Sequence, residues 1–186
     1  MRPLNSLPGR QSMPARPNTM RNVLLAVLIV ACALSRLLPH PPNFSPLEAT
    51  ALFAGAYFAH RGLAMLVPLA AMALSDAVLG WHDGLPLVYA CIAAMALAGS
   101  VVLRTRRTPA RIALSGLGAA LFFFFVTNGA IWLSAGTDFC TGTLGACYAA
   151  GLPFLKNQLA GVAFYSVLLF GTWRLLERRW SVAAAA

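Results

Sequence analysis

The segment Trp81–Cys91, with the sequence WHDGLPLVYAC, is a short polar turn that joins two long apolar runs. It holds a histidine, a carboxylate and two aromatic side chains, and its cysteine lies about 9 Å into the second run if that run is helical. The runs on either side, residues 63–80 and 85–103, are each long enough to cross the hydrocarbon core of a bilayer. The segment therefore predicts a hairpin of two membrane-spanning helices whose turn carries chemically distinctive side chains.

The composition of the whole chain is that of an integral membrane protein. Of the 186 residues, 59% are hydrophobic and only 10% are charged, whereas about a quarter of the residues in a soluble domain are charged. We therefore expect an all-α, polytopic membrane protein with six transmembrane helices. The predicted spans are residues 22–38, 46–59, 63–80, 85–103, 112–134 and 154–176.

The predicted domain organisation is a single membrane domain between two short tails. Residues 1–20 are basic and rich in proline, without periodicity, and we expect a disordered cytoplasmic tail. Residues 21–180 form the six-helix membrane domain, and residues 181–186 form a C-terminal tail. A signal peptide is the alternative for the N-terminus, because Ile29–Cys32 resembles a lipoprotein cleavage box. The apolar spans that follow favour the tail.

The net charge of +9 is explained by the positions of the basic residues. They gather at the ends of the apolar runs: Arg2, Arg10, Arg16, Arg21, Arg61, Arg104, Arg106, Arg107, Arg111, Arg174, Arg178 and Arg179. This is the distribution expected of cytoplasmic loops, so we expect both termini to lie in the cytoplasm. We expect the lipid bilayer to be a partner of the protein, and we expect no binding to nucleic acid. The outer loops are then residues 38–45, 81–84 and 135–153.

Polar side chains within the spans suggest a cavity on the outer side. A carboxylate such as Asp76 inside a span costs roughly 2.5–3.5 kcal/mol to insert, so it should face a partner or a cavity. The plain alternative is a hydrogen bond to a neighbouring helix end. Asn128 and the run Lys156–Gln158 also fall in the outer half and predict a polar-lined outer cavity. Ala90, Ala94 and Ala98 form a ridge of small residues that would let another helix approach closely.

The four cysteines divide into two groups. Cys140 and Cys147 share an outer loop, where an oxidising compartment favours a disulfide between them. Cys32 has no polar neighbour in sequence and is expected to pack in the core. Cys91 is either a buried apolar residue or a soft-metal ligand near the outer face. Neither HExxH nor CxxC occurs in the sequence, so a zinc site built from such motifs is not expected.

The chain resembles the BtuM-type vitamin B12 transporters of Gram-negative bacteria, and more broadly the S-components of energy-coupling-factor (ECF) transporters. The resemblance covers residues 21–179 and is carried by Arg36–Pro46 (RLLPHPPNFSP), by Ser75-Asp76 with Gly80 and Trp81, and by Tyr89 with Cys91. It implies a cobalamin uptake protein of the bacterial inner membrane. The Ala-xxx-Ala pair of module-docking S-components is absent from the first span, where Val30 follows Ala26, so an ECF module is not required.

The resemblance also implies the roles of individual residues. The thiolate of Cys91 would ligate the cobalt of cobalamin and weaken the bond on the opposite face, which would promote loss of cyanide from cyanocobalamin as an activity accessory to transport. The remaining ligand-binding residues would be aromatic side chains packed on the corrin, Phe44, Trp81 and Tyr89, and polar side chains near its amides, His40 and Asp76. The alternatives are an S-component for a different small vitamin, a structural membrane protein, and a membrane thiol-redox protein that uses Cys140 and Cys147.

The orientation is the first testable prediction. Because the basic turn at residues 104–111 should be cytoplasmic, a cysteine introduced there should react with a membrane-impermeant maleimide only after the cells are opened. Labelling of the same cysteine in intact cells, at the rate found for a cysteine in residues 81–84, would reverse the assigned topology.

Overall fold

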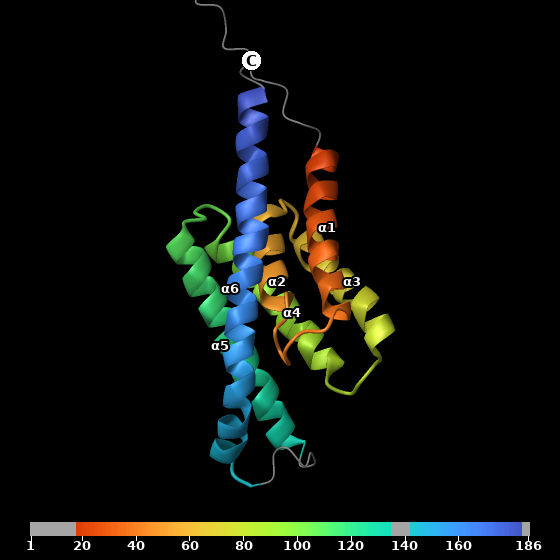
Figure 1. Ribbon diagram of the computed structural model, residues 1–186, viewed down its shortest axis with the longest axis vertical. Helices are drawn as coiled ribbons and strands as arrows, with labels where there is room; N and C mark the ends of the chain where they lie inside the picture. Colours follow the sequence, from red (N-terminus) through yellow and green to blue (C-terminus); the bar gives the residue numbers. More distant parts are fainter. Residues whose placement is uncertain (1–17, 135–141, 184–186) are drawn as a thin grey trace, which may run out of the picture.

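The computed structural model describes residues 18–134 and 142–183, and within these ranges the chain is helical with no strand. The helical elements alternate in direction along the chain (Figure 1). They are α1 (Asn18–Leu34), the 3-10 helix η1 (Ser35–Leu37), α2 (Leu47–Tyr57), α3 (Arg61–Leu79), α4 (Leu85–Val102), α5 (Pro109–Leu133) and α6 (Leu144–Ala183). The predicted all-α fold class is therefore confirmed.

Within residues 18–134 and 142–183, five helices are long and apolar enough to cross a membrane, where six spans were predicted. The exception is α2, whose 11 residues span about 16 Å, roughly half of the hydrocarbon core. All of its residues from Glu48 to Tyr57 are buried by protein. A helix that is enclosed on every side is apolar all round, as a membrane span is, and this explains why its sequence resembled one.

Three basic side chains, one from α1 and two from the turn between α4 and α5, cap the C-terminal end of α2. Arg21 donates a hydrogen bond to the Tyr57 carbonyl at 2.7 Å, Arg107 donates to the Ala56 carbonyl, and Arg104 donates to that of Ala59. The last carbonyls of a helix have no partner within the helix, so these donors satisfy groups that the bilayer could not. The start of α1 and the end of α6 lie at this same end (Figure 1), which we call the basic end.

The helices α2 and α4 meet backbone to backbone. A Cβ atom on Gly55 would lie 2.1 Å from the Ala96 carbonyl oxygen and 2.6 Å from the Ser100 nitrogen. A Cβ atom on Gly99 would lie 2.7 Å from the Leu52 carbonyl oxygen. Glycine at both positions is what allows this close approach. The predicted ridge is not part of it, because Ala90, Ala94 and Ala98 are exposed.

The proline-rich segment between η1 and α2 is irregular and lies against the middle of α6. Asn157 donates a hydrogen bond to the Pro42 carbonyl at 3.0 Å, and the Phe44 ring packs against Phe164 and Tyr165, with both centroid separations 5.8 Å. A Cβ atom on Gly161 would lie 2.8 Å from the backbone nitrogen that follows Phe44. The segment therefore contacts α6 near Pro42 and Phe44, whereas residues 38–43 are exposed.

The loop predicted at residues 135–153 is shorter than expected, because α6 begins at Leu144 and continues through Pro153. Pro153, the predicted end of this loop, lies inside a helix of 40 residues, about 60 Å long. Cys147 is disulfide-bonded. Its predicted partner, Cys140, lies outside the described residues, so that pairing stays a prediction. The predicted tail at residues 1–20 also lies largely outside them, and α1 begins at Asn18.

The close contact of α2 and α4 predicts the effect of one methyl group. We expect Gly55→Ala to destabilise the fold by about 1–3 kcal/mol or more, because the new Cβ atom meets backbone that cannot move aside. Gly118→Ala is the control, since its Cβ atom would meet nothing within 4 Å. Thermal unfolding in detergent should show a lower midpoint for the first variant only, and equal midpoints would contradict the packing described here.

Candidate functional site

A charged pair joins the end of α1 to α3. Arg36, in η1, donates from Nη1 to Asp76 Oδ1 at 2.7 Å and to the hydroxyl of Ser75 at 2.6 Å. The side chain of Asp76 is 2% exposed and that of Arg36 is 15% exposed, so the pair is largely withdrawn from solvent. Charges in such a place interact strongly, but each is costly to bury without the other.

Tyr89 of α4 completes the network. Its hydroxyl donates to Asp76 Oδ2 at 2.9 Å, so both carboxylate oxygens accept a hydrogen bond. Ser75 accepts from Arg36 and donates to the Met72 carbonyl at 2.8 Å. Three elements are thus held together by one polar cluster, which we call the Arg36–Asp76–Tyr89 cluster. Connected hydrogen bonds of this kind favour a single geometry.

An open pocket of about 450 Å³ lies at the turn between α3 and α4. Tyr89 belongs to both structures, because its side chain lines the pocket while its hydroxyl bonds the buried carboxylate. The indole of Trp81 is 68% exposed and forms part of the same wall. The lining residues are Trp81, His82, Asp83, Leu85, Pro86 and Tyr89.

The sequence-predicted site residues are only partly gathered here. Trp81, Tyr89 and Asp76 come together at the α3–α4 end. Cys91 is 2% exposed, has a free thiol and is not among the described residues that line the pocket. His40 is exposed, and its ring nitrogen Nδ1 lies 3.0 Å from the Pro41 carbonyl. Phe44 packs against α6, away from this pocket.

Arg36 is the site residue that sequence reasoning missed. The sequence motif that begins at Arg36 did not predict that this residue is the partner of Asp76. The signal was present, because Arg36 is the single arginine at the outer end of a predicted span, against the general trend of the basic residues.

A second buried polar pair links α2 to α6. Glu48 Oε1 accepts a hydrogen bond from Gln158 at 2.6 Å, and Gln158 also donates to the Ala120 carbonyl at 3.2 Å. Both residues are at most 2% exposed, and within the described part of the chain Glu48 Oε2 has no hydrogen-bond partner. Gln158 was expected to line an outer cavity with other polar residues of its helix and of α5. Instead, Asn128 bonds the Phe124 carbonyl of its own helix and Lys156 is exposed.

No protein-built metal centre is present in residues 18–134 and 142–183, where no three His, Cys, Asp or Glu side chains gather closely enough to hold an ion.

The fold and the site define an all-helical membrane protein with a buried charged pair beneath an open pocket. The chain belongs to the family described as a family of unknown function, DUF6580, whose match covers residues 16–184. No curated protein and no solved structure matches the chain. The family description states no activity, so the function must be argued from the site itself.

Removal of one or both charges of the pair tests its role in stability. We expect Asp76→Leu alone to cost about 3–5 kcal/mol, because it leaves the guanidinium of Arg36 buried without its partner. Adding Arg36→Met should recover part of this loss, since no unpaired charge remains. Thermal midpoints of the two single variants and the double variant give the coupling directly. Strictly additive losses would contradict a coupled pair.

Proposed function

We propose that the protein is a membrane-embedded binding protein for the uptake of a small organic solute, and that this solute is cobalamin. The observation that carries the proposal is the position of Tyr89, which lines an open pocket while it bonds the buried Arg36–Asp76 pair. Ionisable residues within a membrane protein's spans are costly, and they commonly mark binding or transport sites.

The pocket has the character of a site for an organic ligand. Its volume of about 450 Å³ lies within the usual range for small-molecule sites. Aromatic and aliphatic groups form much of its wall, and His82 and Asp83 add polar groups at the turn. The rings of Trp81 and Tyr89 would pack against a flat corrin, and the polar groups would bond its peripheral amides.

Ligation of cobalt by Cys91 is part of the proposal and requires the pocket to open. The thiol lies two positions beyond Tyr89 on α4 and is buried in this structure. A corrin is also larger than the pocket, so binding would separate the turn from its neighbours in any case. Gly80, at the end of α3 with a φ of 102°, is where the turn could change direction without a side-chain penalty.

Cobalt ligation would also account for the accessory reaction, which is the loss of cyanide from cyanocobalamin. The thiolate sulfur would donate electron density to cobalt from one face and weaken the bond to cyanide on the other. Cyanide would then leave with its electron pair, so the oxidation state of cobalt would not change and no reductant would be needed.

The finer architecture belongs to the same proposal. We propose an ECF S-component-like protein of the bacterial inner membrane that has both termini in the cytoplasm and works without an obligatory ECF module. The arginines that gather at the basic end support this orientation. The short α2 would take the place of the second of six spans.

A membrane thiol-redox protein is the second candidate function. It is favoured by one observation, that Cys147 is disulfide-bonded near the start of α6. Such a protein would cycle this disulfide and would have no use for the pocket at the far turn. An S-component for another vitamin would use the pocket but would give no cobalt spectrum.

The visible spectrum of bound cobalamin is the deciding measurement. Purified protein mixed with cyanocobalamin should retain a red or orange colour through gel filtration, and its spectrum should differ from that of the free vitamin. Cys91→Ser should weaken binding without abolishing it and should restore a spectrum like that of the free vitamin, because a hydroxyl is a poor ligand for a soft metal site.

Cys32→Ser is the matched control, since Cys32 is also a buried free thiol, 6% exposed. It should leave the spectrum unchanged. Retained colour with an unaltered spectrum in Cys91→Ser would make Cys91 a packing residue. Absence of retained cobalamin in the wild-type protein would overturn the choice of ligand.

A further inference from the structure

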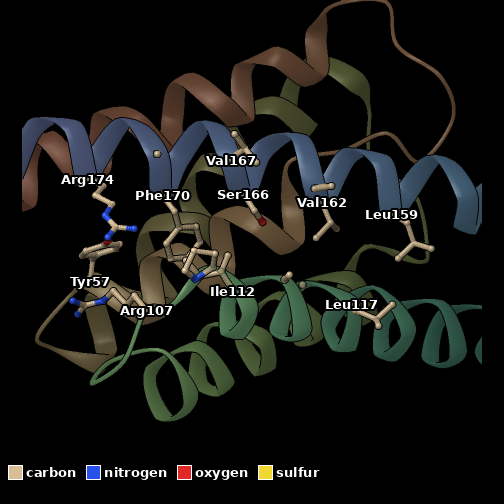
Figure 2. A pocket seen from close by; sticks show the side chains of 15 residues that line it. Tyr57, Arg107, Ile112, Leu117, Leu159, Val162, Ser166, Val167, Phe170 and Arg174 are labelled. Atoms are coloured by element: carbon tan, nitrogen blue, oxygen red, sulfur yellow. The ribbon is translucent and has the colours of Figure 1, made fainter.

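A second and larger cavity, of about 470 Å³, is a groove between α5 and α6 (Figure 2), and it shares no lining residue with the proposed cobalamin pocket. Its walls are mainly apolar along both helices and include Ile112, Leu117, Leu159, Val162, Val167 and Phe170. The groove begins at the basic end, beside Tyr57, and runs along the helices toward the middle of the bundle. A groove of this shape fits a hydrocarbon chain.

Two arginines stand at the basic end of the groove. Arg107 is fixed there, because it donates twice to the Ala56 carbonyl and its guanidinium carbon lies 4.3 Å from the centre of the Tyr57 ring. Arg174 points to the same place from α6 (Figure 2) and forms no hydrogen bond or ion pair with the described residues. Glu177, one turn further along α6, accepts a hydrogen bond from the Trp173 indole at 2.7 Å.

Ser166 supplies an independent sign that the groove holds a ligand. It lines the groove (Figure 2) and is only 7% exposed, and its hydroxyl oxygen has no hydrogen-bond partner among the described residues. Within a bilayer, water does not readily satisfy such a hydroxyl, and an unsatisfied one is costly. An acceptor carried by a bound molecule would remove this cost.

We propose that the groove binds one acidic phospholipid, with its phosphodiester between Arg107 and Arg174 and one acyl chain along the apolar walls. Arginine binds phosphate oxygens through paired, charge-assisted hydrogen bonds, and basic pockets between membrane helices are suited to acidic headgroups. An ester carbonyl at the top of the acyl chain accepts the hydrogen bond from Ser166. This inference does not depend on the proposed transport function.

The spacing along α6 agrees with this placement. Ser166 and Arg174 are eight positions apart, about 12 Å along the helix axis. Because helical side chains lean toward the N-terminus, the guanidinium of Arg174 is brought back toward Ser166. A lipid presents its groups in the same order, with phosphate above ester carbonyl and ester carbonyl above hydrocarbon. The charged end of the groove favours this occupant over an apolar helix of a partner or of a second copy.

Native mass spectrometry of the detergent-purified protein tests the proposal. Phosphatidylglycerol and phosphatidylcholine with identical acyl chains are added in equal amounts, and one bound phosphatidylglycerol should dominate. Arg174→Gln should lower its occupancy about five-fold relative to phosphatidylcholine, which corresponds to about 1 kcal/mol. Arg106→Gln is the matched control, because it removes the same charge from an exposed side chain of the basic end that does not line the groove.

A second pair of variants tests the groove itself. Gly171 lines it, and a Cβ atom there would meet nothing within 4 Å, so Gly171→Leu should fill the groove without disturbing the fold. Gly118→Leu is the control, since its Cβ atom also has open space and its position is not in this groove. We expect the first variant to lose the bound phosphatidylglycerol and the second to keep it.

Three results would overturn the proposal. Equal occupancy by the two lipids in the wild-type protein would show that the groove does not select acidic headgroups. Retention of the bound lipid by Gly171→Leu would place it elsewhere on the surface. A dimer mass that Gly171→Leu converts to a monomer would show that a second copy of the chain covers the groove.

Discussion

The backbone contact between α2 and α4 is the constraint on which the rest of the structure depends. Because Gly55 and Gly99 have no side chains, the two helices approach until a single methyl group would collide with a carbonyl. This contact holds an 11-residue helix inside the bundle, although its length of about 16 Å covers only roughly half of the hydrocarbon core. The last carbonyls of this helix are capped by arginines from other segments, and the irregular chain before it contacts α6.

Two buried polar pairs join different helices around α2. Arg36 and Asp76 tie α1 to α3, with Tyr89 adding α4. Glu48 and Gln158 tie α2 to α6. In the first pair both carboxylate oxygens accept hydrogen bonds, and Tyr89 connects the pair to an open pocket. The second pair is enclosed, and one oxygen of Glu48 has no hydrogen-bond partner among the described residues. The difference explains why the first pair is the better candidate for ligand recognition, since a change at the pocket wall is transmitted directly to its charges.

The sequence was most informative where structure is local. The predicted spans at 63–80, 85–103 and 112–134 agree closely with α3, α4 and α5, because apolar runs and their flanking turns encode helix limits. The sequence did not predict contacts between residues that lie far apart in the chain. The partners of Asp76 and Gln158 are 40 and 110 positions away, and no local pattern records such a pairing. The alanine ridge on α4 does not form the expected helix contact, because small residues at helical spacing do not reveal which face of a helix packs against a neighbour.

The dependence of α2 on α6 has a consequence for biosynthesis. The ribosome makes α6 after α2, yet α6 carries both the amide that bonds Glu48 and the amide that bonds the Pro42 carbonyl. Until α6 emerges and inserts, the nascent chain holds a carboxyl group and a stretch of irregular backbone without these partners. The helices before α6 therefore form only a provisional assembly, and α2 reaches its final bonding pattern after α6 has been made.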